Sequence, residues 1–250
     1  MCGRFGLTWA WEDLFEYFSI IPTEQDKAAP GMPPRYNIAP TQPIVTIGIG
    51  PDGRRQALLA RWGLVPTWVK DPKGFTLLIN ARSETAAEKP SFRAAMRHRR
   101  ILIPASGFFE WQRFGKDRKS QPYWVTRADG ELMVFGGLME TWAGEDGSEI
   151  DTACIITTSA NDNFAPIHHR LPMIVEPEHF ERWLDCRTRE PKDVADLIAP
   201  APDDLLKPVP VSDRVNRVAN GDASIIEPVE LAKESGQAKP DDDDGQLGLF

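Results

Sequence analysis

Short apolar runs separated by turn residues recur along most of the chain, and this pattern predicts a strand-rich fold. The runs are rich in β-branched and aromatic residues, so we expect strands at residues 44–49, 56–62, 76–80, 101–103, 108–111, 123–126, 132–135 and 153–158. Asp129-Gly130 and Asp146-Gly147 are typical of hairpin turns, because glycine adopts the positive φ that such turns need.

Helical periodicity is limited to short segments. In residues 8–18, Trp11, Phe15 and Phe18 fall on one face, which predicts an amphipathic helix. Further short helices are expected at residues 92–99, 177–184 and 191–198, and the last two open on a proline, which suits a first helical turn. These elements together predict an α+β fold.

The composition changes after Leu231 and divides the chain into a domain and a tail. We expect residues 1–231 to form one domain. Residues 232–250 carry two lysines against one glutamate and four aspartates, a net charge of −3, with few apolar residues before the last four. Such a segment buries too little apolar surface to fold, so a disordered acidic tail is predicted.

Composition excludes several classes of protein. Three cysteines without a C-x-x-C pair argue against a disulfide scaffold or a structural zinc site, and free thiols suit a reducing cytosol. The chain shows neither a signal peptide nor an apolar run of about 18 residues. A net charge of −8 argues against indiscriminate binding to nucleic acid but leaves room for a local basic groove. We therefore expect a cytoplasmic protein without metal or cofactor.

The first residues, Met1-Cys2-Gly3-Arg4, carry the most distinctive candidate chemistry. A small second residue normally allows removal of the initiator methionine, so the mature protein would begin with Cys2. An α-amine has a pKa of about 8 and a thiol one of about 8.5, so a fraction of each is reactive at neutral pH. The amine can form a Schiff base with an aldehyde, and the thiol can then close a thiazolidine ring. The alternative is a cysteine that stands there by accident.

Three other polar side chains stand beside apolar runs. Glu110 follows two phenylalanines, and apolar surroundings raise the pKa of a carboxyl, which can then act as a general acid or base. His168 can shuttle protons at neutral pH, and Asn80 ends an apolar run. Each has a structural alternative: Glu110 facing solvent from a strand, His168 hydrogen-bonded within a loop, and Asn80 ending a strand in a turn.

Basic residues occur in two settings. Arg93 and residues 97–100 form a cluster that fits either a solvated helix face or a phosphate-binding groove. By contrast, four arginines lie in segments that also hold Trp, Asn or His: Arg4, Arg61, Arg82 and Arg170. Guanidinium groups beside aromatic rings suit a single strand of nucleic acid, whose phosphates pair and whose bases stack.

These segments occur together, in this order, in one family. From Cys2 to about Val218 the chain resembles the SRAP (SOS response-associated peptidase) proteins. The resemblance rests on residues 1–5 (MCGRF), 36–41 (YNIAPT), 61–68 (RWGLVPTW), 80–85 (NARSET), 99–111 (RRILIPASGFFEW) and 168–172 (HHRLP). Phe109, Ile101 and Leu171 stand where the family often has Tyr, Cys and Met. The resemblance implies one strand-rich domain with a β-barrel-like core, peripheral short helices and a DNA-binding groove.

The resemblance also implies a function and the residues that perform it. The protein would sense abasic sites in single-stranded DNA and form a covalent thiazolidine cross-link that shields the lesion during the DNA-damage (SOS) response. Cys2 matches the nucleophile and Glu110 the glutamate that assists ring opening and proton transfers. His168 matches the histidine that assists lesion opening and β-elimination, and Asn80 an asparagine that positions the N-terminus.

Six further residues would contact the DNA by the same resemblance. Arg4, Arg82 and Arg170 would bind phosphates, while Trp62, Trp68 and Pro40 would wedge or stack against bases that flank the lesion. For the two tryptophans and Pro40, ordinary core packing is the alternative. The expected partner is then single-stranded DNA with an abasic site. We expect the protein to be a monomer that associates with the nucleoid.

The tail ends in Gln246-Leu247-Gly248-Leu249-Phe250, which resembles the short motif that docks bacterial repair proteins on the DNA sliding clamp. In that motif, Gln and Leu fill one pocket while the terminal Leu-Phe fills an apolar groove. A chance match, or packing of the tip back onto the domain, is the alternative.

Two other functions stay open at the level of sequence. One is a cysteine peptidase or autopeptidase, with Cys2 attacking a peptide carbonyl, His168 as base and Glu110 as orienter. The other is a binding module that reads modified bases without forming a bond.

Overall fold

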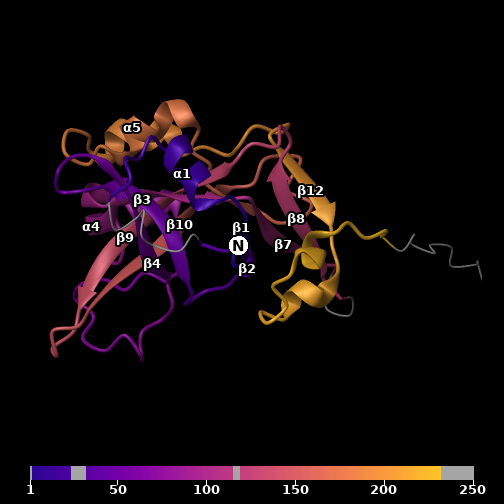
Figure 1. The fold of residues 1–250 in the computed structure, drawn as a ribbon, viewed down its shortest axis with the longest axis horizontal. Helices are drawn as coiled ribbons and strands as arrows, with labels where there is room; N and C mark the ends of the chain where they lie inside the picture. Colours follow the sequence, from indigo (N-terminus) through magenta and orange to yellow (C-terminus); the bar gives the residue numbers. More distant parts are fainter. Residues whose placement is uncertain (1, 24–31, 115–118, 232–250) are drawn as a thin grey trace, which may run out of the picture.

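The computed structural model describes residues 2–23, 32–114 and 119–231, and its core is a closed barrel (Figure 1). Five strands neighbour one another in the order β3-β4-β10-β9-β6, and β6 returns to pair with β3. All neighbours are antiparallel except β4 and β10. The strands span Pro43–Ile49 (β3), Arg55–Trp62 (β4), Arg100–Ala105 (β6), Met133–Ala143 (β9) and Glu149–Ser159 (β10). The predicted strand-rich fold with a barrel core and short helices is confirmed.

A second, antiparallel sheet stands beside the barrel in the order β12-β8-β7-β1-β2. Its strands span Phe5–Leu7 (β1), Arg35–Ile38 (β2), Gly107–Gln112 (β7), Gln121–Arg127 (β8) and Leu206–Pro210 (β12). Only Ser106 separates β6 of the barrel from β7 of the sheet. The start of the chain therefore lies between the two units, as Figure 1 shows.

Two short strands extend the C-terminal half of β10. On one side β5 (Asn80–Arg82) runs parallel to it, and on the other β11 (Arg170–Pro172) runs antiparallel. The predicted strand at 76–80 is wrong, because Leu77 is 41% exposed and Leu78 forms only an isolated bridge to Leu64. The apolar residues before Asn80 belong to a loop, and pairing with β10 begins where the prediction ended.

Short helices cover the outside of the strands. They are α1 (Trp11–Tyr17), α3 (Ser83–Ala86), α4 (Arg93–His98) and α5 (Phe180–Leu184), with 3-10 turns η1 (Pro177–His179), η2 (Pro191–Leu197), η3 (Asp213–Asn216) and η4 (Ala223–Ile226). The helix expected from residue 8 begins only at Trp11, because the backbone N–H of Thr8 is held by Ser106 Oγ at 2.9 Å. The segment at 191–198 is a 3-10 turn rather than an α-helix. None of the helices within the described ranges is long and apolar enough to cross a membrane.

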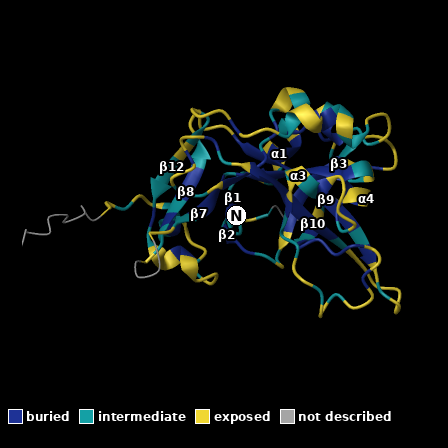
Figure 2. Ribbon diagram, turned by 180° about the vertical axis from the view of Figure 1, so that it is seen from behind, coloured by how far each residue is buried: buried dark blue, intermediate teal, exposed yellow. Residues whose placement is uncertain are grey.

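Aromatic rings join the second sheet to the barrel. Phe5 of β1 packs edge-on against Trp62 of β4 at 5.1 Å and against Phe135 of β9 at 6.0 Å. All three are fully buried or nearly so. In Figure 2 the barrel strands β9 and β10 are mostly dark blue, whereas β12 at the edge of the second sheet is teal. Because β1 begins three residues after Cys2, this packing fixes the start of the chain in place.

Three arginines of the basic cluster at 93–100 make contacts that hold the fold together. Arg97 pairs with Glu190 and Arg99 with Asp151. Arg100 is only 2% exposed and lies over the Trp183 ring. Its guanidinium donates to four backbone carbonyls, those of Trp183 (2.7 Å), Met96 (3.0 Å), Asp185 (2.7 Å) and Arg189 (3.2 Å). Arg100 therefore ties β6 to α4, α5 and the loop that follows.

Replacing Arg100 with Met should lower the free energy of unfolding by about 3 kcal/mol, because four backbone carbonyls, two of them in fully buried contacts, lose their donor. Urea unfolding followed by circular dichroism measures the change. Arg54→Met is the matched control, since the Arg54 side chain is 72% exposed and should lose no more than about 0.5 kcal/mol. Equal losses in the two variants would contradict this role for Arg100.

Candidate functional site

Cys2 lies at the seam between the barrel and the second sheet, and it is 1% exposed. Its carbonyl oxygen accepts a hydrogen bond of 2.9 Å from Asn80 Nδ2. Asn80 is held there because β5 pairs with β10, with Asn80 opposite Ile155. The other amide atom of this side chain, Oδ1, is buried and has no hydrogen-bond partner. It is an available acceptor at the start of the chain.

Glu110 reaches the same place from β7. The strand pairs with β1, and the N–H of Phe109 donates to the carbonyl of Arg4 at 2.8 Å. Phe109 packs against Trp124 on one face of β7. Because side chains alternate along a strand, Phe108 and Glu110 lie on the opposite face. Glu110 is 4% exposed, and its Oε1 accepts from the N–H of Trp111 at 3.2 Å. The alternative of a glutamate facing solvent is therefore wrong.

The electrostatics of the site join Cys2, Glu110 and His168. Burial raises the pKa of the Cys2 thiol far above its usual range, and the negative charge of Glu110 raises it further. Burial lowers the pKa of His168, and the charge of Glu110 opposes that change. The charge of Glu110 thus raises the pKa of both groups. At neutral pH the site holds a protonated thiol and a neutral imidazole.

His168 is presented by the loop before β11. Its Nδ1 accepts a hydrogen bond of 3.0 Å from the backbone N–H of Arg170 and lies 3.2 Å from the carbonyl oxygen of the same residue. Both backbone groups of Arg170 therefore lie within hydrogen-bonding distance of Nδ1 and hold the ring in place. His169 stacks on this ring at 4.4 Å and is itself exposed.

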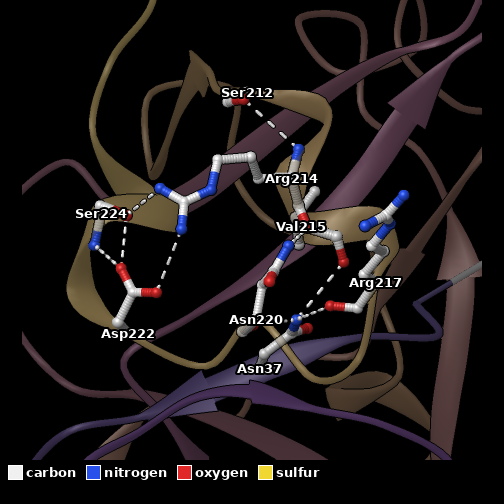
Figure 3. A network of polar contacts seen from close by, with 8 residues as sticks. All are labelled: Asn37, Ser212, Arg214, Val215, Arg217, Asn220, Asp222 and Ser224. Atoms are coloured by element: carbon white, nitrogen blue, oxygen red, sulfur yellow. Dashed lines mark hydrogen bonds and ion pairs between the residues drawn. The ribbon is translucent and has the colours of Figure 1, made fainter.

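Arg4 extends from the same start of the chain and contacts Asn37 and Val215, two members of the polar network that Figure 3 shows. Its Nη1 donates to Asn37 Oδ1 at 2.7 Å and to the Val215 carbonyl at 2.9 Å. Asn37 Nδ2 in turn donates to the carbonyls of Arg217 (3.2 Å) and Asn220 (2.6 Å). Sequence reasoning missed Asn37 as a site residue, although it lies within the segment 36–41 that carried the family resemblance.

The remaining predicted DNA contacts divide into exposed and buried residues. Trp68 is 57% exposed and packs edge-on against Phe75 at 5.7 Å. Arg82 is exposed at the end of β5, and Pro40 is half-buried before Thr41, whose φ is 74°. These side chains have surface to offer a ligand.

Two of the predicted DNA contacts are buried in the structure. Trp62 has no exposed surface, and its Nε1 donates to the carbonyl of Ile79 at 3.0 Å. Its ring belongs to the core, so base stacking by Trp62 is wrong and the packing alternative holds. Arg170, a predicted phosphate contact, is 9% exposed, and its guanidinium is engaged by Glu84 and Thr157.

Other features of the molecule lie apart from these residues. Within residues 2–23, 32–114 and 119–231, no group of three His, Cys, Asp or Glu side chains is arranged to hold a metal ion. A cavity of about 920 Å³ opens beside the β3–β4 hairpin and is lined by residues such as Gly50, Arg99 and Cys186, but by none of the predicted site residues. The predicted clamp-binding residues Gln246, Leu247, Leu249 and Phe250 lie outside the described part of the chain.

Comparison with known proteins gives the class. The family "SOS response associated peptidase (SRAP)" matches residues 1–218. The chain therefore belongs to the SRAP family. It is 37% identical over 227 residues to abasic site processing protein YoqW of Bacillus subtilis, covering 91% of this chain and 99% of that one.

Two further comparisons agree with the family. Abasic site processing protein YedK of Escherichia coli is 31% identical over 234 residues, covering 92% of this chain and 100% of its own. A crystal structure of a protein from Bacteroides thetaiotaomicron matches with a TM-score of 0.81 at 22% identity, covering 92% of this chain and 100% of that chain. At that identity the match supports the fold alone.

Proposed function

We propose that this protein captures abasic sites in single-stranded DNA as a covalent thiazolidine on Cys2. The observation that carries the proposal is the convergence of Cys2, Asn80 and Glu110 at the seam between barrel and sheet, with His168 under the same carboxylate charge. The abasic site processing names of the relatives give the substrate class.

The reaction balances with the groups at hand. Removal of Met1 turns the amide nitrogen of Cys2 into an amine. That amine attacks the C1′ aldehyde of the ring-opened sugar, and loss of one water gives a Schiff base. The thiol sulfur then adds to the carbon of the C=N bond, its proton passes to the nitrogen, and a five-membered ring closes. No oxidant, metal or cofactor takes part.

The site residues have distinct tasks in this scheme. Because burial keeps the Cys2 thiol protonated, ring closure needs a base, and Glu110 is the carboxylate whose charge acts on that sulfur. The buried Oδ1 of Asn80 would accept an N–H of the new amine and orient its lone pair. His168, whose ring is held by the main chain of Arg170, would donate a proton to the sugar oxygen during ring opening and serve β-elimination of the lesion.

The DNA would be held as a single strand, because a stacked duplex cannot bring its sugar to a buried residue. Arg4 has no carboxylate partner within the described ranges, and burial lowers its pKa, so a phosphate would compensate its charge. Arg82 would bind a second phosphate, and Trp68 with Pro40 would stack on the flanking bases.

A denaturing gel tests the proposal. An abasic single-stranded oligonucleotide should give a shifted band that survives denaturant, whereas the intact strand and an abasic duplex should not. A shift that disappears under denaturing conditions would favour a reader that binds without a bond.

Peptidase chemistry is less favoured by the site. Attack on an amide needs a thiolate, and burial raises the pKa of the Cys2 thiol far above neutrality. The peptide cleavage that remains to be tested is the protein's removal of its own Met1. Protein made without a methionine aminopeptidase separates the cases, since a retained Met1 would exclude self-removal.

The tail would bring this chemistry to replication forks. We propose that Gln246, Leu247, Leu249 and Phe250 dock on the bacterial sliding clamp, which places the protein on the nucleoid during the SOS response. Deleting residues 246–250 should abolish clamp binding in surface plasmon resonance and leave DNA cross-linking unchanged. Equal clamp affinity with and without these residues would contradict this docking.

A further inference from the structure

Arg170 links three elements at the C-terminal end of β10, where β5 and β11 pair with this strand. It lies on β11, and its Nη2 donates to the carbonyl and, at 3.3 Å, to Oγ1 of Thr157 on β10. The same guanidinium forms two hydrogen bonds to the carboxylate of Glu84, the longer being 3.0 Å. Glu84 lies in α3, directly after β5. One side chain thus straps β11 across β10 to the β5–α3 segment.

The strap depends on an ion pair that persists over the working pH range. The Arg170 side chain is only 10% exposed, while that of Glu84 is 54% exposed. The guanidinium lowers the pKa of Glu84 to about 2, so its carboxylate stays ionised. Two parallel hydrogen bonds to a carboxylate fix the guanidinium plane as well as its position.

The backbone of Arg170 is also what orients the site histidine. Its N–H donates to His168 Nδ1 at 3.0 Å. Which nitrogen of a neutral imidazole carries the proton is set by the hydrogen bond that the other nitrogen makes. The carbonyl oxygen of Arg170 lies 3.2 Å from the same Nδ1. A main chain held by the strap therefore keeps the ring in one orientation and its proton on one nitrogen.

We propose that Glu84 is a positioning residue for His168, acting through Arg170 to hold the ring in one orientation and in a single tautomer. Glu84 touches neither Cys2 nor the reacting sugar in this scheme. Only the kinetic part of the test below rests on the proposed function, because the tautomer of His168 is a property of the protein without DNA.

The first measurement is spectroscopic. In ¹⁵N-histidine-labelled protein, the two ring nitrogens of His168 should give widely separated shifts, as a single tautomer does. In Glu84→Gln, which keeps the shape but removes the charge, the two shifts should move toward each other. Glu88→Gln is the matched control, since Glu88 is an exposed carboxylate four residues further on. Unchanged His168 shifts in Glu84→Gln would overturn the proposal.

The second measurement is kinetic. With saturating abasic single-stranded DNA, Glu84→Gln should slow cross-linking about ten-fold while the Kd for DNA stays within about two-fold. Arg170→Lys, which keeps the charge but loses the planar fork, should slow it to a similar extent. A wild-type rate in Glu84→Gln would overturn the role in the reaction. If the wild-type protein itself forms no cross-link, the proposed function fails while the tautomer result stands.

Discussion

Replacing Cys2 with Ala should abolish the denaturant-resistant adduct with abasic single-stranded DNA. Met1 would still be removed before Ala, so the amine remains and forms only a Schiff base. Without sulfur no ring closes, and the imine hydrolyses when the protein is denatured. A denaturing gel of the variant beside the wild-type protein measures the loss.

The same variant should retain non-covalent binding to that DNA within a few-fold. The variant keeps the proposed contacts at Arg4, Arg82 and Trp68, and it changes only the buried side chain of Cys2. Fluorescence anisotropy at a stated salt concentration provides the control. An adduct that persists in Cys2→Ala would show that another nucleophile reacts.

Replacing Glu110 with Gln should slow cross-linking on the order of 100-fold, the usual contribution of a positioned general acid–base group. The change keeps the size and the hydrogen bond to Trp111, but it removes the base whose charge acts on Cys2 and His168. Single-turnover kinetics with excess protein measure the rate of ring closure.

Glu140→Gln is the matched control for this variant. Glu140 is also a buried strand glutamate, 8% exposed on β9, and burial raises its pKa, yet it is not part of the proposed site. Its rate of cross-linking should equal that of the wild-type protein. Equal slowing in both variants would mean that a loss of stability, rather than of chemistry at Glu110, causes the effect.

Much of the fold could be predicted because its strands are distinct apolar runs with clear turn residues between them. The run at 153–158, for example, lies within β10. The run at 76–80 misled for a physical reason. Leu78 and Ile79 pack against the core from a loop, and an apolar pattern alone does not distinguish such packing from a hydrogen-bonded strand.

The site was only partly accessible from the sequence. Cys2 and Asn80 are 78 positions apart, yet Asn80 donates to the Cys2 carbonyl because β5 docks on β10. That contact could be expected from the family resemblance, not from spacing. The burial of Trp62 and the pairing of Arg170 with Glu84 could not, since both depend on which face of a strand or loop meets the core.

Intact-protein mass spectrometry of the reaction with an abasic oligonucleotide tests the central claim most directly. The account predicts a protein mass without Met1 that increases by the mass of the oligonucleotide less one water, with the adduct mapped to Cys2. A retained Met1 in a cross-linked protein, or an adduct mapped to a lysine, would contradict it.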